Sequence, residues 1–127
     1  MSQILLIEDH PTNRKLMTGI LSAAGNDVYE AVTAESGIEE AITRMPDLIV
    51  LDIQLPGNDG LSVVRALRAR TDTRHIPFLA VTARAMSGDK EVILGAGCDG
   101  YVSKPISYKL FMEEVVRLLE RTDGSPQ

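Results

Sequence analysis

The sequence predicts an open α/β fold in which a parallel sheet of five strands is covered by helices on both faces. Three short apolar runs do not alternate with polar residues, which is typical of strands buried on both sides; they lie at 4–7, 48–51 and 78–81. Weaker strand patterns occur at 28–31 and 101–103. Helical patterns separate these runs, and regular alternation of strands and helices is typical of parallel α/β domains.

Each predicted helix carries an apolar stripe with residues spaced three to four apart. The first stripe includes Leu16 and Leu21 and precedes Gly25, a residue type that often ends helices. The second runs from Ile38 to Met45 and stops before a proline. The other three stripes are formed by Leu61, Val64, Leu67 and Arg68, by Val92, Ile93 and Ala96, and by Leu110, Phe111, Val115, Leu118 and Leu119 after Ser107.

These elements amount to five strand–helix units, which are too few for an eight-unit barrel. Right-handed crossovers then favour an open, doubly wound sheet with strand order 2-1-3-4-5, as in flavodoxin-like folds. A chain of 127 residues fits one such domain.

Composition excludes several classes of function. The net charge of -5 repels nucleic acid, so we expect no direct DNA binding. No apolar run is long enough to insert into a membrane. The single cysteine, Cys98, can form no internal disulfide, which favours a cytoplasmic location.

Polar side chains follow the predicted strands at the edge where open α/β sheets bind ligands. They are Glu8 and Asp9 after the first strand, Asp52 after the third, Thr82 at the end of the fourth and Lys104 after the fifth. Neighbouring acids repel one another unless a cation joins them, and oxygen ligands alone favour Mg²⁺. The ammonium group of Lys104 and the hydroxyl group of Thr82, added to these acids, suit phosphoryl transfer. Asp52 is central among the strand ends and is therefore the predicted phosphoryl acceptor, which would form an acyl phosphate.

These residues resemble the receiver domain of two-component response regulators. The resemblance covers residues 3 to about 121 and rests on Glu8-Asp9, Asp52 within 51–56, Gly60, Thr82-Ala83, Tyr101 and Lys104-Pro105. Among receivers, the chain is most similar to the stand-alone cell-cycle and polar-differentiation type, over 52–56, 80–83 and 103–107. The resemblance implies a receiver domain over 1–121 and a short tail over 122–127.

The resemblance implies the following site. Asp52 accepts a phosphoryl group from a sensor histidine kinase or a histidine phosphotransfer protein. Mg²⁺ is the cofactor, held by Glu8, Asp9, Asp52 and the backbone carbonyl of Gln54. Lys104 pairs with the phosphoryl group.

The resemblance also implies how the signal leaves the site. Thr82 and Tyr101 form the switch pair, and the Lys104-Pro105 bond is cis. Phosphorylation then changes binding of a downstream protein at the surface of the fourth helix, fifth strand and fifth helix. We expect a monomer, or a weak dimer on phosphorylation, that catalyses only its own phosphorylation and dephosphorylation. In the family, residues at the positions of Gln54 and Arg84 tune the phosphoryl lifetime.

Two other functions stay open at this point. One is a Mg²⁺-dependent phosphatase with an aspartyl nucleophile; enzymes that resemble haloacid dehalogenases carry a second acid two residues after the nucleophile. Gln54 occupies that position and cannot transfer a proton. The other is a pseudo-receiver that binds partners without phosphate, which the intact Asp9, Asp52, Thr82 and Lys104 argue against.

Two further patterns have simpler interpretations. Residues 95–100 spell G-x-G-x-x-G, but they follow a predicted helix and lead into a strand, so they indicate a turn rather than a dinucleotide site. A cluster of four arginines within 65–74 predicts a solvated basic face; they are Arg65, Arg68, Arg70 and Arg74. In the loop over 56–60, Asn58 stands where a hydrophobic residue is frequent in receivers.

Overall fold

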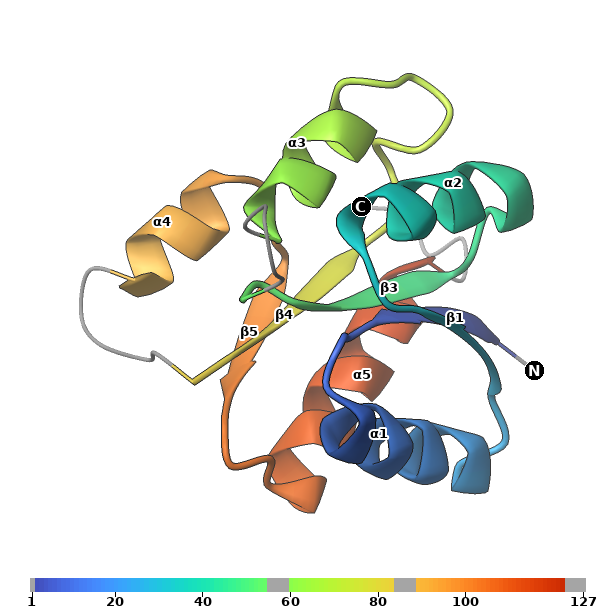
Figure 1. Cartoon of the computed structure of the whole chain (residues 1–127), viewed down its shortest axis with the longest axis vertical. Coiled ribbons are helices and arrows are strands. Elements are labelled where there is room, and N and C mark those ends of the chain that lie inside the picture. The colour runs from blue at the N-terminus through green and yellow to red at the C-terminus, as the bar shows by residue number, and fades with distance from the viewer. Residues whose placement is uncertain (1, 55–59, 84–88, 123–127) are drawn as a thin grey trace.

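The structure, a computed structural model, describes residues 2–54, 60–83 and 89–122. Five parallel strands form one sheet in the order β2-β1-β3-β4-β5, which confirms the predicted fold class and strand order (Figure 1). Strands and helices alternate along the described residues as β1 (Gln3–Ile7), α1 (Pro11–Ala23), β2 (Asp27–Ala31), α2 (Ala34–Arg44), β3 (Leu48–Asp52), α3 (Leu61–Arg68), β4 (Phe78–Thr82), α4 (Asp89–Gly95), β5 (Gly100–Ser103) and α5 (Tyr108–Thr122).

The sheet is sandwiched between two helical layers. Helices α1 and α5 cover one face, and α2, α3 and α4 cover the other (Figure 1). Successive strand residues point to opposite faces, so Ile4 and Leu6 pack with Met17 and Phe111, whereas their neighbour Leu5 packs in the other core. Burying each such side chain fully contributes about 1.5–3 kcal/mol. The central strands are therefore held from both sides, and the residues at their ends are fixed in place.

Helix ends follow the signals in the sequence. Thr33 and Ser36 form a capping box at the start of α2. That helix ends at Arg44, and the C-cap residue Met45 adopts a left-handed conformation with φ 49° directly before Pro46. Gly25 follows α1 with φ 94°, as expected for a residue just beyond a helix end.

The G-x-G-x-x-G pattern is a turn, as predicted. Helix α4 ends at Gly95, and β5 begins at Gly100. Between them Gly97 has φ 117°, a conformation that favours glycine over residues with a side chain. The pattern therefore carries the chain from a helix into a strand, the reverse of a dinucleotide-binding turn.

Several residues of the predicted apolar stripes are exposed instead of buried, and Met45 at the end of the second stripe is one of them. Leu16, Val92 and Leu110 retain 48%, 57% and 57% of their accessible surface. Their sequence neighbours on the same helices, such as Met17 and Phe111, are fully buried. Each stripe is wider than the sector of the helix that the sheet covers, so its edge residues stay in solvent.

The prediction that Arg68 belongs to a solvated face is wrong. Its guanidinium group donates hydrogen bonds to the carbonyl oxygens of Gly97 and Ile76, at 2.9 and 2.6 Å, and pairs with Asp99 at 2.8 Å. It also lies over the ring of Phe78, 4.9 Å from the ring centroid. The reason is that Arg68 is the last residue of the buried stripe of α3, so its side chain reaches over the starts of β4 and β5.

Some expectations fall on other parts of the chain. Arg84 and the loop residues 55–59, including Asn58, lie outside the described residues. Helix α5 includes Thr122, the first residue of the predicted tail, and 123–127 are also outside the described part. None of the helices in the described ranges combines the length and apolar character needed to cross a bilayer.

Replacing Arg68 with methionine should lower the free energy of unfolding by about 2–3 kcal/mol, because the carbonyl groups and the carboxylate that it binds lose their donor. The control is Arg70→Met, which removes an arginine from a solvent-exposed pair with Asp72 and should lower the free energy of unfolding much less than Arg68→Met does. Urea unfolding measures both values. Equal losses in the two variants would show that the Arg68 contacts stabilise the fold no more than an exposed ion pair does, which would contradict the prediction.

Candidate functional site

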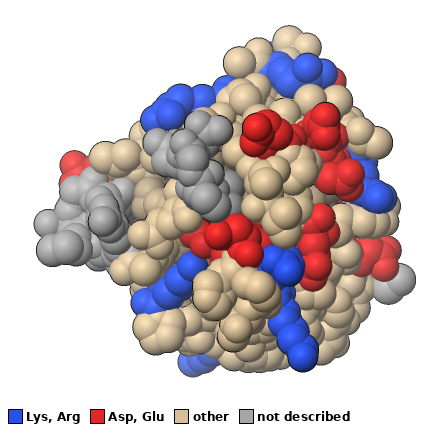
Figure 2. All heavy atoms as spheres, in the orientation of Figure 1, with Lys and Arg blue, Asp and Glu red and all other residues tan. Residues whose placement is uncertain are grey.

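The predicted site residues lie together at the carboxyl edge of the sheet. Glu8 and Asp9 directly follow β1, Asp52 ends β3, Thr82 ends β4 and Lys104 directly follows β5. The parallel register brings these strand ends to one edge. Acidic side chains gather near the middle of the face shown in Figure 2, with basic side chains beside them.

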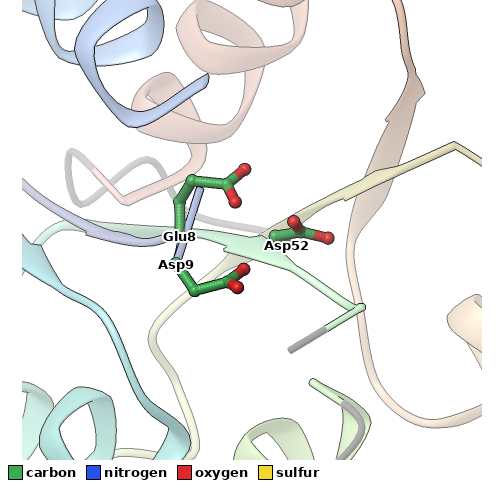
Figure 3. A group of neighbouring side chains, drawn as sticks. All are labelled: Glu8, Asp9 and Asp52. Carbon is green, nitrogen blue, oxygen red and sulfur yellow. The ribbon is translucent and has the colours of Figure 1, made fainter. Parts of the chain in front are cut away.

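Three carboxylates converge at this edge. Glu8, Asp9 and Asp52 each place an oxygen within 4.8 Å of an oxygen of the other two. Figure 3 shows their carboxylate groups projecting into the same space from the ends of β1 and β3. Glu8 and Asp52 are buried, with 0% and 2% exposure, whereas Asp9 is half-buried. Two of the three negative charges are therefore largely removed from water.

Lys104 is the cation closest to these acids among the described residues. Its Nζ atom donates to Oδ2 of Asp52 at 2.9 Å and lies 3.6 Å from Oε1 of Glu8. The other oxygen of Asp52 accepts the backbone N–H of Gln54 at 2.9 Å. The Lys104-Pro105 peptide bond is cis, as predicted. When all three carboxylates are ionised, the one ammonium leaves a net formal charge of −2 at the site.

The carboxyl group of Glu8 has a raised pKa. Burial raises the pKa of its carboxyl group to about 7, and the neighbouring Asp52 adds to the increase. Its Oε2 atom accepts the backbone N–H of His10 at 3.0 Å. Its Oε1 atom is buried and has no hydrogen-bond partner among the described residues.

A divalent cation fits this arrangement. Hard cations such as Mg²⁺ bind oxygen ligands that carry negative charge. The site offers the Oε1 atom of Glu8, which accepts no hydrogen bond from the described residues, next to the carboxylates of Asp9 and Asp52. The three side chains can hold Mg²⁺ while leaving coordination positions for water or a phosphate oxygen. The backbone carbonyl of Gln54 as a further ligand stays a prediction.

The predicted switch residues occupy neighbouring strands. Thr82 is fully buried at the end of β4, and Tyr101 is half-buried on β5, opposite Ala80. Thr82 accepts the backbone N–H of Lys104 through its own carbonyl at 2.8 Å, which joins the two strand ends. The side chain of Gln54 reaches the same region, where it accepts the N–H of Ala83 at 3.4 Å.

Gly60 is close to the acceptor because it has no side chain. A Cβ atom at this position would lie 2.5 Å from Cα of Ile53 and 2.7 Å from the carbonyl oxygen of Asp52. The N–H of Gly60 donates to the carbonyl of Ile53 at 2.8 Å. Only glycine lets the start of α3 pack this closely against the backbone of the acceptor.

Sequence reasoning missed one residue near the site. Arg14 on α1 donates from Nη1 to the carbonyl oxygens of Glu8 and Asp9, both at 3.2 Å. Nothing in the sequence distinguishes it from Lys15, which is adjacent and exposed. A side chain that binds backbone carbonyls leaves no pattern in the sequence.

A family model for the response regulator receiver domain matches residues 4–116. The chain belongs to this family. It is 44% identical over 115 residues to the polar-differentiation response regulator DivK of Brucella ovis, with 88% of this chain and 91% of that protein covered. DivK of Brucella anthropi is 43% identical over the same length. The predicted likeness to polar-differentiation receivers is therefore confirmed.

Solved structures of receiver domains share the fold. A putative response regulator from Chloroflexus aurantiacus has a TM-score of 0.90 at 27% identity, covering 94% of this chain and 98% of the other. The receiver domain of a sensor histidine kinase from Pseudomonas aeruginosa PAO1, which has a magnesium ion coordinated in its active site cleft, has a TM-score of 0.83 at 35% identity and 98% coverage of both chains.

Replacing Glu8 with glutamine should stabilise the metal-free domain at high pH. The pKa of Glu8 is raised from 4.5 to about 7 in the folded state, so the folded state keeps a proton that the unfolded state loses. The free energy of unfolding of the wild type therefore falls by about 2–3 kcal/mol as pH rises between these two values. Glutamine does not ionise, so Glu8→Gln does not lose this stability.

Urea unfolding in EDTA at about pH 4.5 and about pH 8 measures the effect, with the exposed Glu39→Gln as control. The stability difference between Glu8→Gln and wild type should grow with pH, whereas the difference for the control should stay constant. A difference for Glu8→Gln that is the same at both pH values would contradict the prediction.

Proposed function

We propose that this receiver domain is a phosphorylation-activated switch whose acceptor is Asp52. The donor is the phosphohistidine of a sensor histidine kinase or a histidine phosphotransfer protein, and the reaction depends on Mg²⁺. The observation that carries the proposal is the 2.9 Å contact between Lys104 and Asp52 inside a cluster of three carboxylates. The likeness to DivK further supports a role in polar-differentiation signalling.

The proposed reaction uses groups already in place. A carboxylate oxygen of Asp52 attacks the phosphorus, so that an O–P bond forms while the P–N bond of the donor breaks and its electron pair stays on the imidazole nitrogen. Glu8, Asp9 and Asp52 would hold Mg²⁺, which would neutralise charge on the phosphoryl oxygens when bound. The ammonium of Lys104 moves from the Asp52 carboxylate to a phosphoryl oxygen. The magnesium ion in the Pseudomonas aeruginosa receiver supports the choice of metal.

We further propose that the domain acts on no substrate besides its own phosphoryl group. Turnover of external phosphate esters by an aspartyl nucleophile needs a general acid for the leaving group. Gln54 lies two residues beyond the acceptor and donates its backbone N–H to Asp52, but its amide side chain is too weak an acid to protonate a leaving group. This supports a switch over the phosphatase alternative.

The proposed output surface is formed by α4, β5 and α5. A groove of about 520 Å³ lies along these elements, and its lining includes Leu94, Tyr101 and Leu110. Tyr108 at the start of α5 is 63% exposed, which leaves a further aromatic side chain accessible to a partner. Because Tyr101 belongs both to this groove and to the strand that precedes Lys104, a change in its ring position can carry the signal from the site to the partner.

Asp52→Asn should abolish phosphorylation, because the amide keeps the shape of the carboxylate but removes the nucleophilic anion. Wild type incubated with acetyl phosphate and Mg²⁺ should gain one phosphoryl group per chain by intact-mass spectrometry. The control Asp27→Asn changes an exposed aspartate elsewhere and should label as wild type does. Labelling that persists in Asp52→Asn would refute the assignment, and repeated release of phosphate from a phosphate monoester would favour the phosphatase.

Thr82→Ala should keep phosphorylation but lose the change at Tyr101, because the hydroxyl that bonds the phosphoryl oxygen is gone. Thr82→Ser keeps the hydroxyl and serves as the matched control. The measurement is fluorine NMR of fluorotyrosine-labelled protein with and without beryllofluoride, with each of the three tyrosines assigned by substitution to phenylalanine. A beryllofluoride-dependent Tyr101 shift of the same size in Thr82→Ala would rule out Thr82 as the coupling residue.

A further inference from the structure

The loop that carries Glu8 and Asp9 is held by a side chain from α1. Arg14 donates from Nη1 to the carbonyl oxygens of both acids at 3.2 Å. Its Nε atom lies 3.6 Å from Oε1 of Glu30 on β2. The other oxygen of Glu30 accepts the hydroxyl of Thr18, one turn further along α1, at 2.6 Å. Arg14 is therefore fixed from one side by Glu30 while it binds the loop on the other.

The loop depends on such support because it is short and carries two functional groups. Three residues, 8–10, separate the end of β1 from the start of α1 at Pro11. The N–H of Glu8 is bound to the carbonyl of Ala31 on β2 at 3.0 Å, which fixes the start of the loop. The two carbonyl groups that follow it along the chain are those bound by Arg14.

The carboxylates of Glu8 and Asp9 are carried by the same short stretch of backbone that Arg14 binds. A displacement of this backbone moves the Cα atoms from which the two side chains project, so the carboxylates move with it. Their oxygens now lie within 4.8 Å of one another and of Asp52, close enough to share one ion. A displaced loop would therefore separate the ligands.

We propose that Arg14 is a positioning residue for the metal centre and that Glu30 and Thr18 hold Arg14 in its working position. This inference rests on the proposed Mg²⁺ site and adds to it three residues that contact no ligand themselves. Partners that orient metal ligands from outside typically change metal affinity by about 10–100-fold when they are replaced.

Positioning and simple charge attraction predict different results for a lysine at this position. An arginine fork donates along several fixed directions, whereas lysine offers a single ammonium at the end of a flexible chain. Arg14→Lys therefore keeps the positive charge near the acids but loses the simultaneous contact with the loop and with Glu30. If Arg14 acted only through its charge, the lysine variant would bind Mg²⁺ as wild type does.

The experiment measures Mg²⁺ affinity directly by titration calorimetry or amide chemical shifts. Arg14→Lys should weaken Mg²⁺ binding at least about tenfold. The control Lys15→Gln removes a charge from the adjacent exposed position and should stay within about twofold of wild type. Thr18→Val removes the hydroxyl that binds Glu30 and leaves Arg14 and the acids unchanged. Weaker Mg²⁺ binding in this variant would show that Glu30 supports Arg14, whether or not Arg14→Lys folds normally. Unchanged Mg²⁺ binding would overturn the role given to Thr18.

A second readout separates positioning from a general loss of structure. With acetyl phosphate as donor, the Mg²⁺ concentration that gives half the maximal phosphorylation rate should rise in Arg14→Lys, while the rate at saturating Mg²⁺ stays near that of wild type. A purely structural role would lower the saturating rate and leave the half-saturating concentration in place, which would overturn the inference.

The remaining outcomes are also decisive. Equal Mg²⁺ affinity in Arg14→Lys and wild type would overturn the inference and leave the proposed switch intact. Failure of wild type itself to bind Mg²⁺ would overturn the proposed metal site, and this inference with it.

Discussion

The ion pair between Lys104 and Asp52 is the interaction on which the site depends, because it joins charges that the fold has largely removed from water. Lys104 lies 2.9 Å from Asp52 and 3.6 Å from Glu8, and both acids are buried. Removing one partner of a buried pair typically costs about 3–5 kcal/mol, since the other charge is left uncompensated. One ammonium cannot neutralise three carboxylates, so the folded domain keeps an excess of negative charge at the edge of its sheet.

Strand order explains why a lysine supplies this charge. The acids come from β1 and β3, which are adjacent, whereas Lys104 follows β5, two strands from β3. Two strand spacings amount to roughly 10 Å. The side chains of Lys104 and Asp52 must span this distance between them, and because the aspartate side chain is short, the cation must be on a long one. The strand between them is β4, whose last residue is Thr82. The hydroxyl proposed to sense the phosphoryl group therefore belongs to the strand that the lysine side chain crosses.

The sequence predicted the parts of the fold and site that depend on local patterns. Unbroken apolar runs identified β1, β3 and β4, and the residues directly after them identified Glu8 and Asp52. It failed where side chains bind backbone carbonyl groups. Arg68 donates to Gly97, 29 residues away, and its place in the predicted stripe of α3 already separated it from the exposed arginines around it. Arg14 donates to carbonyl groups only five and six residues away, but such a contact leaves no pattern of residue types in the sequence. Stripe edges such as Leu16 were misjudged because periodicity does not define how much of a helix the sheet covers.

Magnitudes constrain how the proposed switch can work. A ligand that inverts a 1:99 equilibrium must favour the active state by about 5.5 kcal/mol. A hydrogen bond from Thr82 to a charged phosphoryl oxygen contributes about 1.5–3 kcal/mol, which is less than that inversion requires. The rest must come from Lys104 exchanging the Asp52 carboxylate for the phosphoryl group, or from a resting equilibrium that is already nearly balanced. Because Lys104 stabilises an anion in both states, only the difference between its two pairings counts. The free-energy difference between the two states of such a switch is therefore a small difference between strong interactions. The close packing around Tyr101 must convert that small difference into two discrete arrangements.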